Sequence, residues 1–120
     1  MQVKKPAAAA GVSAEALAAD FLTRRGLRVL ERNFRVRGGE IDLICVDGEC
    51  LVFVEVRLRS GSGFGGAAAS ITPAKQRRIV LAARHYLAGK RERPCRFDAV
   101  LLDGLDETRL EWIKDAFAAD

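Results

Sequence analysis

Two apolar segments separated by an Asp-Gly pair constrain the fold of this chain more than any other feature. Residues 39–44 and 52–59 are rich in Ile, Leu, Val and Phe, which is typical of β-strands. The Asp-Gly pair between them predicts a β-hairpin. Each predicted strand nevertheless carries a carboxylate, Asp42 in the first and Glu55 in the second, and a carboxylate is costly to bury without a cationic partner. The pattern therefore predicts a cation beside these two groups.

The length of the hairpin loop decides how the two carboxylates are arranged. A two-residue loop at Asp-Gly places Asp42 opposite Phe53 and diagonal to Glu55, whereas a four-residue loop places Asp42 directly opposite Glu55. A three-residue loop directs them to opposite faces of the sheet. In the first two cases the Cβ atoms lie about 5–8 Å apart, a separation that suits one divalent ion.

Charge is distributed unevenly along this chain of 120 residues, whose formal net charge is +4. Six arginines lie between residues 24 and 37, eight basic residues lie between 75 and 96, and seven acidic residues lie between 98 and 120. Such segregation predicts one side that faces a polyanion and one that faces solvent, although accidental clustering of surface charge remains an alternative.

The chain length predicts a single domain over residues 13–120, preceded by a flexible tail over residues 1–12. Cys45, Cys50 and Cys95 have no C-x-x-C spacing, so we interpret them as small core residues of a protein in a reducing compartment. No segment is apolar over the length that a membrane span requires. These features predict a cytoplasmic protein.

The order of predicted elements is helix, three strands, helix and two strands, which is an α/β fold with helices flanking a mixed sheet. Ser13 and Thr72-Pro73 are typical helix starts, and Gly26 and Gly89 are typical helix ends. The predicted strands cover residues 27–36, 39–44, 52–59, 97–102 and 109–114. We expect the first strand, rich in arginine, to be an edge, residues 60–67 to form a flexible loop, and residues 115–120 to form a short tail.

This order, with Asp in one hairpin strand and Glu-x-basic in the next, resembles the core of the PD-(D/E)XK nuclease superfamily. More closely, the chain resembles the YraN-like family of bacterial proteins, which is related to Holliday-junction resolvases. The likeness covers roughly residues 11–117. The segments that carry it are Glu15, 31–35, 39–44, 52–56, 75–78 and 96–98. The resemblance implies a restriction-endonuclease-like core.

The resemblance also implies roles for individual residues. It makes Asp42 and Glu55 metal ligands, with the backbone carbonyl of Val56 as a third ligand and Glu15 as a further acid. Gln76 is implied as a polar helper in catalysis. The implied cofactor is Mg²⁺ or Mn²⁺, because oxygen ligands suit such hard ions.

One position departs from the superfamily pattern, since Arg57 stands where the family usually has lysine. Arginine stays protonated and cannot transfer a proton, so this position supplies only charge and hydrogen-bond donors. Arg57 is therefore a catalytic candidate that could bind a phosphate but could not serve as a general acid or base. The nucleic-acid-binding candidates, basic residues on the same strand and on the second helix, are Arg59, Lys75, Arg77 and Arg78.

Three functional hypotheses follow from these features. The first is a metal-dependent endonuclease acting on structured or branched DNA, without membrane contact and with a homodimer as the state expected by analogy. The second is a catalytically impaired nucleic-acid-binding module on the same fold. The third is a protein-interaction domain. A structural ion cluster of Asp42, Glu55, Arg57 and Arg59 is the alternative to a metal site.

Overall fold

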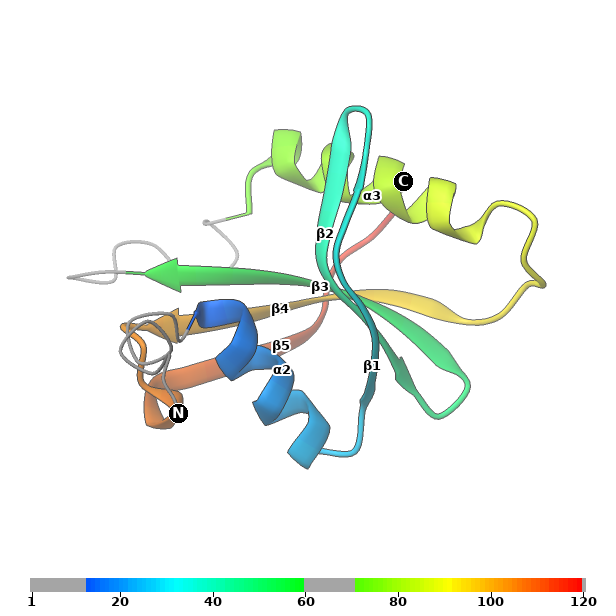
Figure 1. The fold of residues 1–120 in the computed structure, drawn as a ribbon. Coiled ribbons are helices and arrows are strands. Elements are labelled where there is room, and N and C mark those ends of the chain that lie inside the picture. The colour runs from blue at the N-terminus through cyan, green and yellow to red at the C-terminus, as the bar shows by residue number, and fades with distance from the viewer. Residues whose placement is uncertain (1–12, 60–70, 120) are drawn as a thin grey trace, which may run out of the picture.

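The computed structural model describes residues 13–59 and 71–119, which form a mixed α/β fold with the predicted order of elements. A five-stranded sheet carries one α-helix on each face (Figure 1). In chain order the elements are α2 (Ala14–Arg24), β1 (Arg28–Val36), β2 (Gly39–Asp47), β3 (Cys50–Arg59), α3 (Pro73–Leu87), β4 (Cys95–Asp103), the short 3₁₀ helix η2 (Glu107–Arg109) and β5 (Leu110–Phe117).

The strands lie in the sheet in the order in which they occur in the chain, from β1 to β5. All neighbours are antiparallel except β3 and β4, which are parallel. A parallel pair requires a crossover connection, and α3 lies within it. The arginine-rich strand β1 is an edge of the sheet, as the sequence predicts.

Both helices begin at the residues predicted from the sequence. The Ser13 side chain accepts a hydrogen bond from the Ala16 amide, and the Thr72 hydroxyl accepts one from the Lys75 amide at 3.2 Å. Pro73 occupies the first turn of α3, where its missing amide hydrogen costs nothing. These caps fix where each helix starts relative to the strands and so position the acidic and basic side chains described below.

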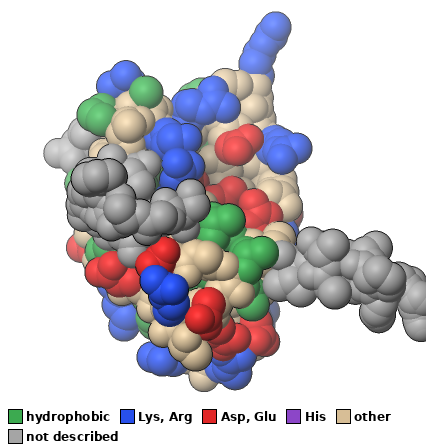
Figure 2. Space-filling model, turned by 90° about the vertical axis from the view of Figure 1, so that its left-hand side faces the viewer, with side chains coloured by type: hydrophobic (Ala, Val, Ile, Leu, Met, Phe, Trp, Pro, Cys, Tyr) green, Lys and Arg blue, Asp and Glu red, His purple; other side chains and the backbone are tan. Residues whose placement is uncertain are grey.

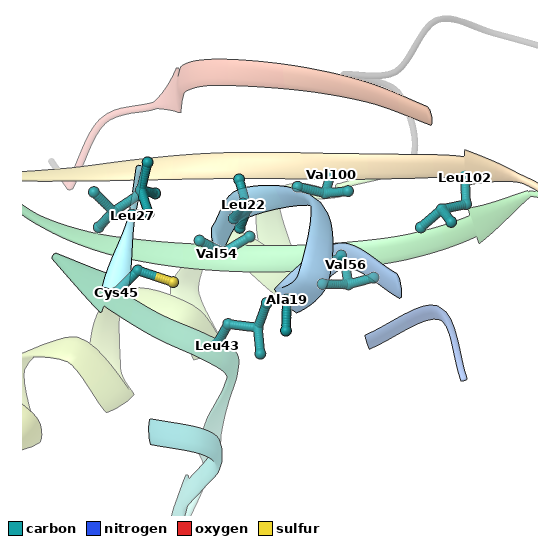
Figure 3. Close-up of a cluster of buried hydrophobic side chains, with 11 residues drawn as sticks. Ala19, Leu22, Leu27, Leu43, Cys45, Val54, Val56, Val100 and Leu102 are labelled. Carbon is teal, nitrogen blue, oxygen red and sulfur yellow. The ribbon is translucent and has the colours of Figure 1, made fainter. Parts of the chain in front are cut away.

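The sheet has a separate apolar core on each face. On one face α2 packs on alternate residues of β2, β3 and β4, with Leu22 fully buried at its centre (Figure 3). On the other face α3 packs through Ile79, Val80 and Ala83 against Phe53 and its neighbours. The residues labelled in Figure 3 show the α2-side core, which includes Leu43, Val54 and Val100.

The C-terminal segment differs from the predicted tail, because β5 continues to Phe117. Asp115 adopts a left-handed conformation (φ 56°) and its amide donates to the Asp98 carboxylate at 2.9 Å. Beyond this irregularity the Phe117 ring stacks on Phe97 with a centroid separation of 4.9 Å. The strand therefore resumes after a kink that no sequence periodicity signals.

The cysteines only partly match the prediction that they are core residues. Cys45 is buried and Cys50 is half-buried, but Cys95 is exposed at the start of β4, so its assignment to the core is wrong. All three are free thiols. The predicted tail at residues 1–12 and loop at residues 60–67 lie outside the described residues. Within 13–59 and 71–119, neither helix has the length and apolarity needed to cross a bilayer.

Candidate functional site

The observed hairpin register places the two predicted carboxylates side by side. Asp47 pairs with Cys50, so the turn consists of Gly48 and Glu49 and not of Asp47 and Gly48. The ladder continues to the pair Leu43–Val54, and one further step places Asp42 opposite Glu55. Of the two arrangements that the sequence allowed, this is the one in which Asp42 lies directly opposite Glu55. It arises from a two-residue turn that lies one residue later in the chain than the predicted turn.

The backbone is distorted at the level of Asp42. In a regular strand Ile41 and Leu43 would share one face, but Ile41 belongs to the α3-side core and Leu43 to the α2-side core. On β1 the residue opposite Asp42 is Asn33, which has a left-handed conformation (φ 53°). Asparagine tolerates this conformation better than most residues. The hairpin thus twists at Asn33 and Asp42, so that Asp42 lies within reach of groups from both faces.

A direct hydrogen bond ties Asp42 to β3. The Val56 amide donates to Asp42 Oδ2 at 2.8 Å, beyond the last backbone pair of β2 and β3. The amide and carbonyl of one strand residue point to the same side of the strand. The Val56 carbonyl therefore also points toward the side where Asp42 lies, as the predicted third ligand requires.

Three carboxyl groups interact at this position. Burial and then the charge of Glu55 raise the pKa of Asp42 to about 7. Burial likewise raises the pKa of Glu55, against the lowering effects of its hydrogen bond to Asp42 and of nearby cations. Burial and the proximity of Asp42 raise the pKa of Glu15, which comes from α2. Ionising all three carboxyl groups together is therefore unfavourable in the folded protein.

Two basic side chains lie beside Glu55. Arg57 Nη1 is 3.7 Å from Glu55 Oε2, which is a long ion pair, and the buried Arg57 Nε has no hydrogen-bond partner among residues 13–59 and 71–119. The charge of Arg57 and then that of Lys75 lower the pKa of Glu55. A small hollow of about 40 Å³ joins Glu55 to Glu40, Lys75 and Arg78. Arg57 and Lys75 therefore offset part of the negative charge of Glu55.

The side of the molecule toward which the C-terminal end of β3 points is shown in Figure 2. Acidic and basic side chains lie next to one another on this face, with apolar side chains beside them. In the site described above, basic side chains lie near Glu55 and Glu15, whereas the main charge effect on Asp42 comes from Glu55. This face of the molecule therefore carries charges of both signs.

The donor set fits a hard divalent ion. Asp42, Glu55, Glu15 and the Val56 carbonyl offer only oxygen, which Mg²⁺ and Mn²⁺ prefer. Within the described ranges, no three His, Cys, Asp or Glu side chains already stand at coordinating positions. Mg²⁺ commonly uses one or two carboxylates and retains several waters, so this pair matches its needs.

Some predicted site residues lie elsewhere. Gln76 donates through Nε2 to the Ile71 carbonyl at 3.1 Å and lines a groove on the opposite flank of α3. Arg77 lines the same groove, whereas Lys75 and Arg78 face Glu55. The Arg59 side chain lies outside the described part of the structure. The sequence placed Lys75, Gln76 and the two arginines on one helix, but it did not reveal which flank faces the carboxylates.

Two residues of the site were not predicted. Glu40 lines the hollow beside Glu55. Its position two residues before Asp42 on the same strand could have indicated that it lies near the site. Asn33 shapes the twist and lowers the pKa of Glu15 by hydrogen bonding. The role of Asn33 could not be predicted from hydrophobic periodicity, because it depends on the left-handed backbone conformation of this residue.

Asp98 belongs to a separate, structural network. Its carboxylate is fully buried (0% exposed) and accepts hydrogen bonds from Arg96, from the Trp112 indole at 3.0 Å and from the Asp115 amide. Arg96 also bridges to Asp47 at 2.9 Å. Because its carboxylate oxygens are occupied by protein donors, Asp98 stabilises β4 and β5 and is not part of the candidate site.

Comparison with known proteins identifies the family. Residues 14–102 match the family described as "Uncharacterised protein family UPF0102". The chain belongs to the UPF0102 family. This UPF0102 chain is 66% identical over 122 residues to a UPF0102 protein of Dechloromonas aromatica, covering 100% of this chain and 99% of the relative.

Further UPF0102 relatives come from other bacteria. A protein of Nitrosomonas europaea is 57% identical over 108 residues, covering 89% of this chain and 92% of the relative. A protein of Cupriavidus taiwanensis is 62% identical over 115 residues, covering 93% of this chain and 85% of the relative. The predicted resemblance to the YraN-like family is thus confirmed as UPF0102 membership. The wider relationship to nucleases stays a prediction.

Proposed function

We propose that this protein is a metal-dependent, endonuclease-like protein that hydrolyses phosphodiester bonds in structured or branched DNA. The observation that carries the proposal is the juxtaposition of Asp42 and Glu55 on neighbouring strands, with Val56 bonded to Asp42. Buried like charges of this kind are costly, and a divalent cation would relieve that cost. The predicted likeness to the PD-(D/E)XK superfamily points to the same pair.

The residues present could divide the work as follows. Asp42, Glu55 and the Val56 carbonyl would hold the ion, and Glu15 would contact its outer waters. When bound, Mg²⁺ supplies polarisation of a phosphoryl oxygen and acidification of water. The Val56 amide orients Asp42, because it fixes one of the two carboxylate oxygens.

The basic residues would bind the substrate. Arg57 remains protonated, so its partly exposed guanidinium group can hold a phosphate oxygen but cannot act as a general base. Lys75 and Arg78, on the flank of α3 that faces Glu55, would contact neighbouring phosphates. In this arrangement Arg57 would neutralise charge at the reacting phosphate, and α3 would contact the nucleic-acid backbone.

A second candidate function is nucleic-acid binding without cleavage. The observation that favours it is Arg57, which replaces the lysine that the superfamily usually carries. If that lysine transfers a proton, its loss would lower the rate on the order of 10²–10⁴-fold. The binding residues would be the same.

Calorimetric titration with MgCl₂ and with MnCl₂ tests the metal site. Wild type is expected to bind the ion with measurable heat, and Asp42→Asn is expected to lose it. Glu111→Gln, which changes an exposed carboxylate on β5, is the control and should bind as wild type does. Absence of binding heat in wild type with either metal would remove the metal-dependent proposal.

Cleavage of branched and linear duplex DNA separates the two candidate functions. With metal present, wild type is expected to cut and Glu55→Ala is expected to be inactive while still binding DNA. Arg57→Lys serves as the diagnostic variant. Cleavage by Arg57→Lys together with inactive wild type would favour the binding module.

A further inference from the structure

A long groove follows the flank of α3 that faces away from the carboxyl cluster. Three adjoining hollows of about 590, 400 and 510 Å³ share lining residues along this flank. They extend from Pro73 at the start of α3 to the loop at 90–95. The helix of 15 residues is about 22 Å long, so the groove is long enough for a second helix.

The groove exists because α3 covers only part of its sheet face. The helix packs chiefly on β2, with further contacts to β1 and β3 (Figure 1). The strip of β4 and β5 beside it presents Phe97 and Phe117, which line the middle hollow together with Val80 and Leu87. The floor is therefore apolar, which is unusual for a surface that binds only nucleic-acid backbone.

The upper rim of the groove is basic. Arg77 and Arg84 are exposed, line the largest hollow, and make no ion pair within residues 13–59 and 71–119. They are seven residues apart, so they stand on one stripe of α3 about 10 Å apart. Among the described residues, none of those that line this hollow is acidic, whereas Asp115 lines the middle hollow and Glu92 lines the third.

We propose that the groove binds an amphipathic helix of a partner protein that carries acidic residues two turns apart. Apolar side chains of such a helix would fill the floor between α3 and β5, and its carboxylates would meet Arg77 and Arg84. Helices pack at 8–10 Å between axes, so a helix lying beside α3 would cover the strip of sheet that α3 leaves open. The proposal concerns a surface other than the carboxyl cluster and does not depend on cleavage.

The test uses a synthetic 18-residue helical peptide with a leucine stripe and glutamates at positions i and i+7. Its control has the same composition in an order that destroys the stripe. Binding to the full chain is measured by fluorescence anisotropy, and ¹⁵N chemical-shift changes locate it. We expect micromolar binding of the first peptide only, with shifts at Val80, Arg84 and Phe117.

A charge-reversed pair of variants makes the test specific. Arg77→Glu/Arg84→Glu is expected to weaken peptide binding about tenfold or more. Arg28→Glu/Arg32→Glu makes the same charge change on β1, at the opposite edge of the sheet, and should leave binding unchanged. Circular dichroism confirms that both variants fold.

Several outcomes would overturn the proposal. Equal binding of both peptides, absence of binding at 1 mM, or shifts centred on Asp42 would each do so. If Arg77→Glu/Arg84→Glu weakens binding of duplex DNA but not of the peptide, the rim belongs to a nucleic-acid surface instead. Loss of metal binding in Asp42→Asn with peptide binding intact separates this proposal from the proposed function.

Discussion

The Val56 amide donates a hydrogen bond to the Asp42 carboxylate at 2.8 Å, joining β3 to a side chain of β2 where their backbone ladder has ended. The bond holds one oxygen of Asp42 in place, and the Asp42 side chain also interacts with Glu55 and Glu15, whose pKa values are raised mainly by burial. The protein thus maintains a compact group of carboxyls that is costly to ionise. This cost has measurable consequences.

The first prediction concerns pH. The pKa of Asp42 is about 7 in the folded protein against an ordinary value of 3.8, so the folded state binds the proton more tightly than the unfolded state. The free energy of unfolding should therefore fall as pH rises from about 4 to 7 and then level off. Asp42→Asn should be more stable than wild type at pH 8, on the order of 1–3 kcal/mol, with little difference at pH 4.

Urea denaturation in EDTA at pH 4, 6 and 8 provides the measurement. Asp20→Asn, which changes an exposed carboxylate on α2, is the control variant and should follow the wild-type curve. A wild-type stability that does not decline between pH 4 and pH 7 would contradict this account of the carboxyl cluster.

The second prediction concerns the buried network around Asp98. Removing its carboxylate in Asp98→Ala leaves Arg96 Nε and the Trp112 indole without their acceptor, while Arg96 keeps its ion pair with Asp47. We expect a loss of about 3–5 kcal/mol in the free energy of unfolding and a change in tryptophan fluorescence. Asp106→Ala removes an exposed cap of the short helix η2 and should destabilise the protein much less. Similar losses in the two variants would show that Asp98 is not the anchor of β4 and β5.

The third prediction concerns Gly39, where β2 passes close to α3. A Cβ atom at this position would lie 2.4 Å from the Arg78 carbonyl oxygen, so Gly39→Ala must push the helix away from the strand. We expect destabilisation of about 1–3 kcal/mol, measured by thermal unfolding. Glu40→Ala, at the next and exposed position, is the comparison and should change stability much less. Unfolding temperatures for Gly39→Ala within error of wild type would argue against this close approach.

The fourth prediction concerns nucleic-acid binding by the helix flank that faces Glu55. If Lys75 and Arg78 each contact a phosphate, replacing both by alanine should lower the slope of log affinity against log salt by about two. Affinity for duplex DNA is measured at several NaCl concentrations between 50 and 200 mM. Arg25→Ala, at the exposed position that follows α2, is the control. An unchanged slope in the double variant would exclude this flank as a phosphate-binding surface.

Much of the fold could be predicted because it follows from local patterns. Alternating apolar residues define β2 and β3, and Ser13 and Thr72 define the helix starts. Hairpin parity also predicted that Asp42 and Glu55 lie close together on one face, since every even loop length gives this result. Parity could not determine the register of the hairpin, because the register depends on Gly48 and Glu49 forming the turn.

The remaining features depend on contacts between distant segments. The left-handed Asn33 that twists the hairpin, and the kink at Asp115, are set by tertiary packing and leave no periodic signal. The separation of Gln76 and Arg77 from the carboxyls depends on how α3 is rotated on the sheet, which a helical pattern alone does not determine. Exposure of Cys95 likewise depends on where β4 begins.

The arginines of β1 have a consequence for self-association. β1 is an edge strand, and an edge presents unpaired backbone groups that invite pairing with another chain. Arg28, Arg32 and Arg35 are all exposed there, so two copies meeting along this edge would bring guanidinium groups together. The positive charge that could attract a polyanion therefore also disfavours edge-to-edge association of the sheets into fibrils.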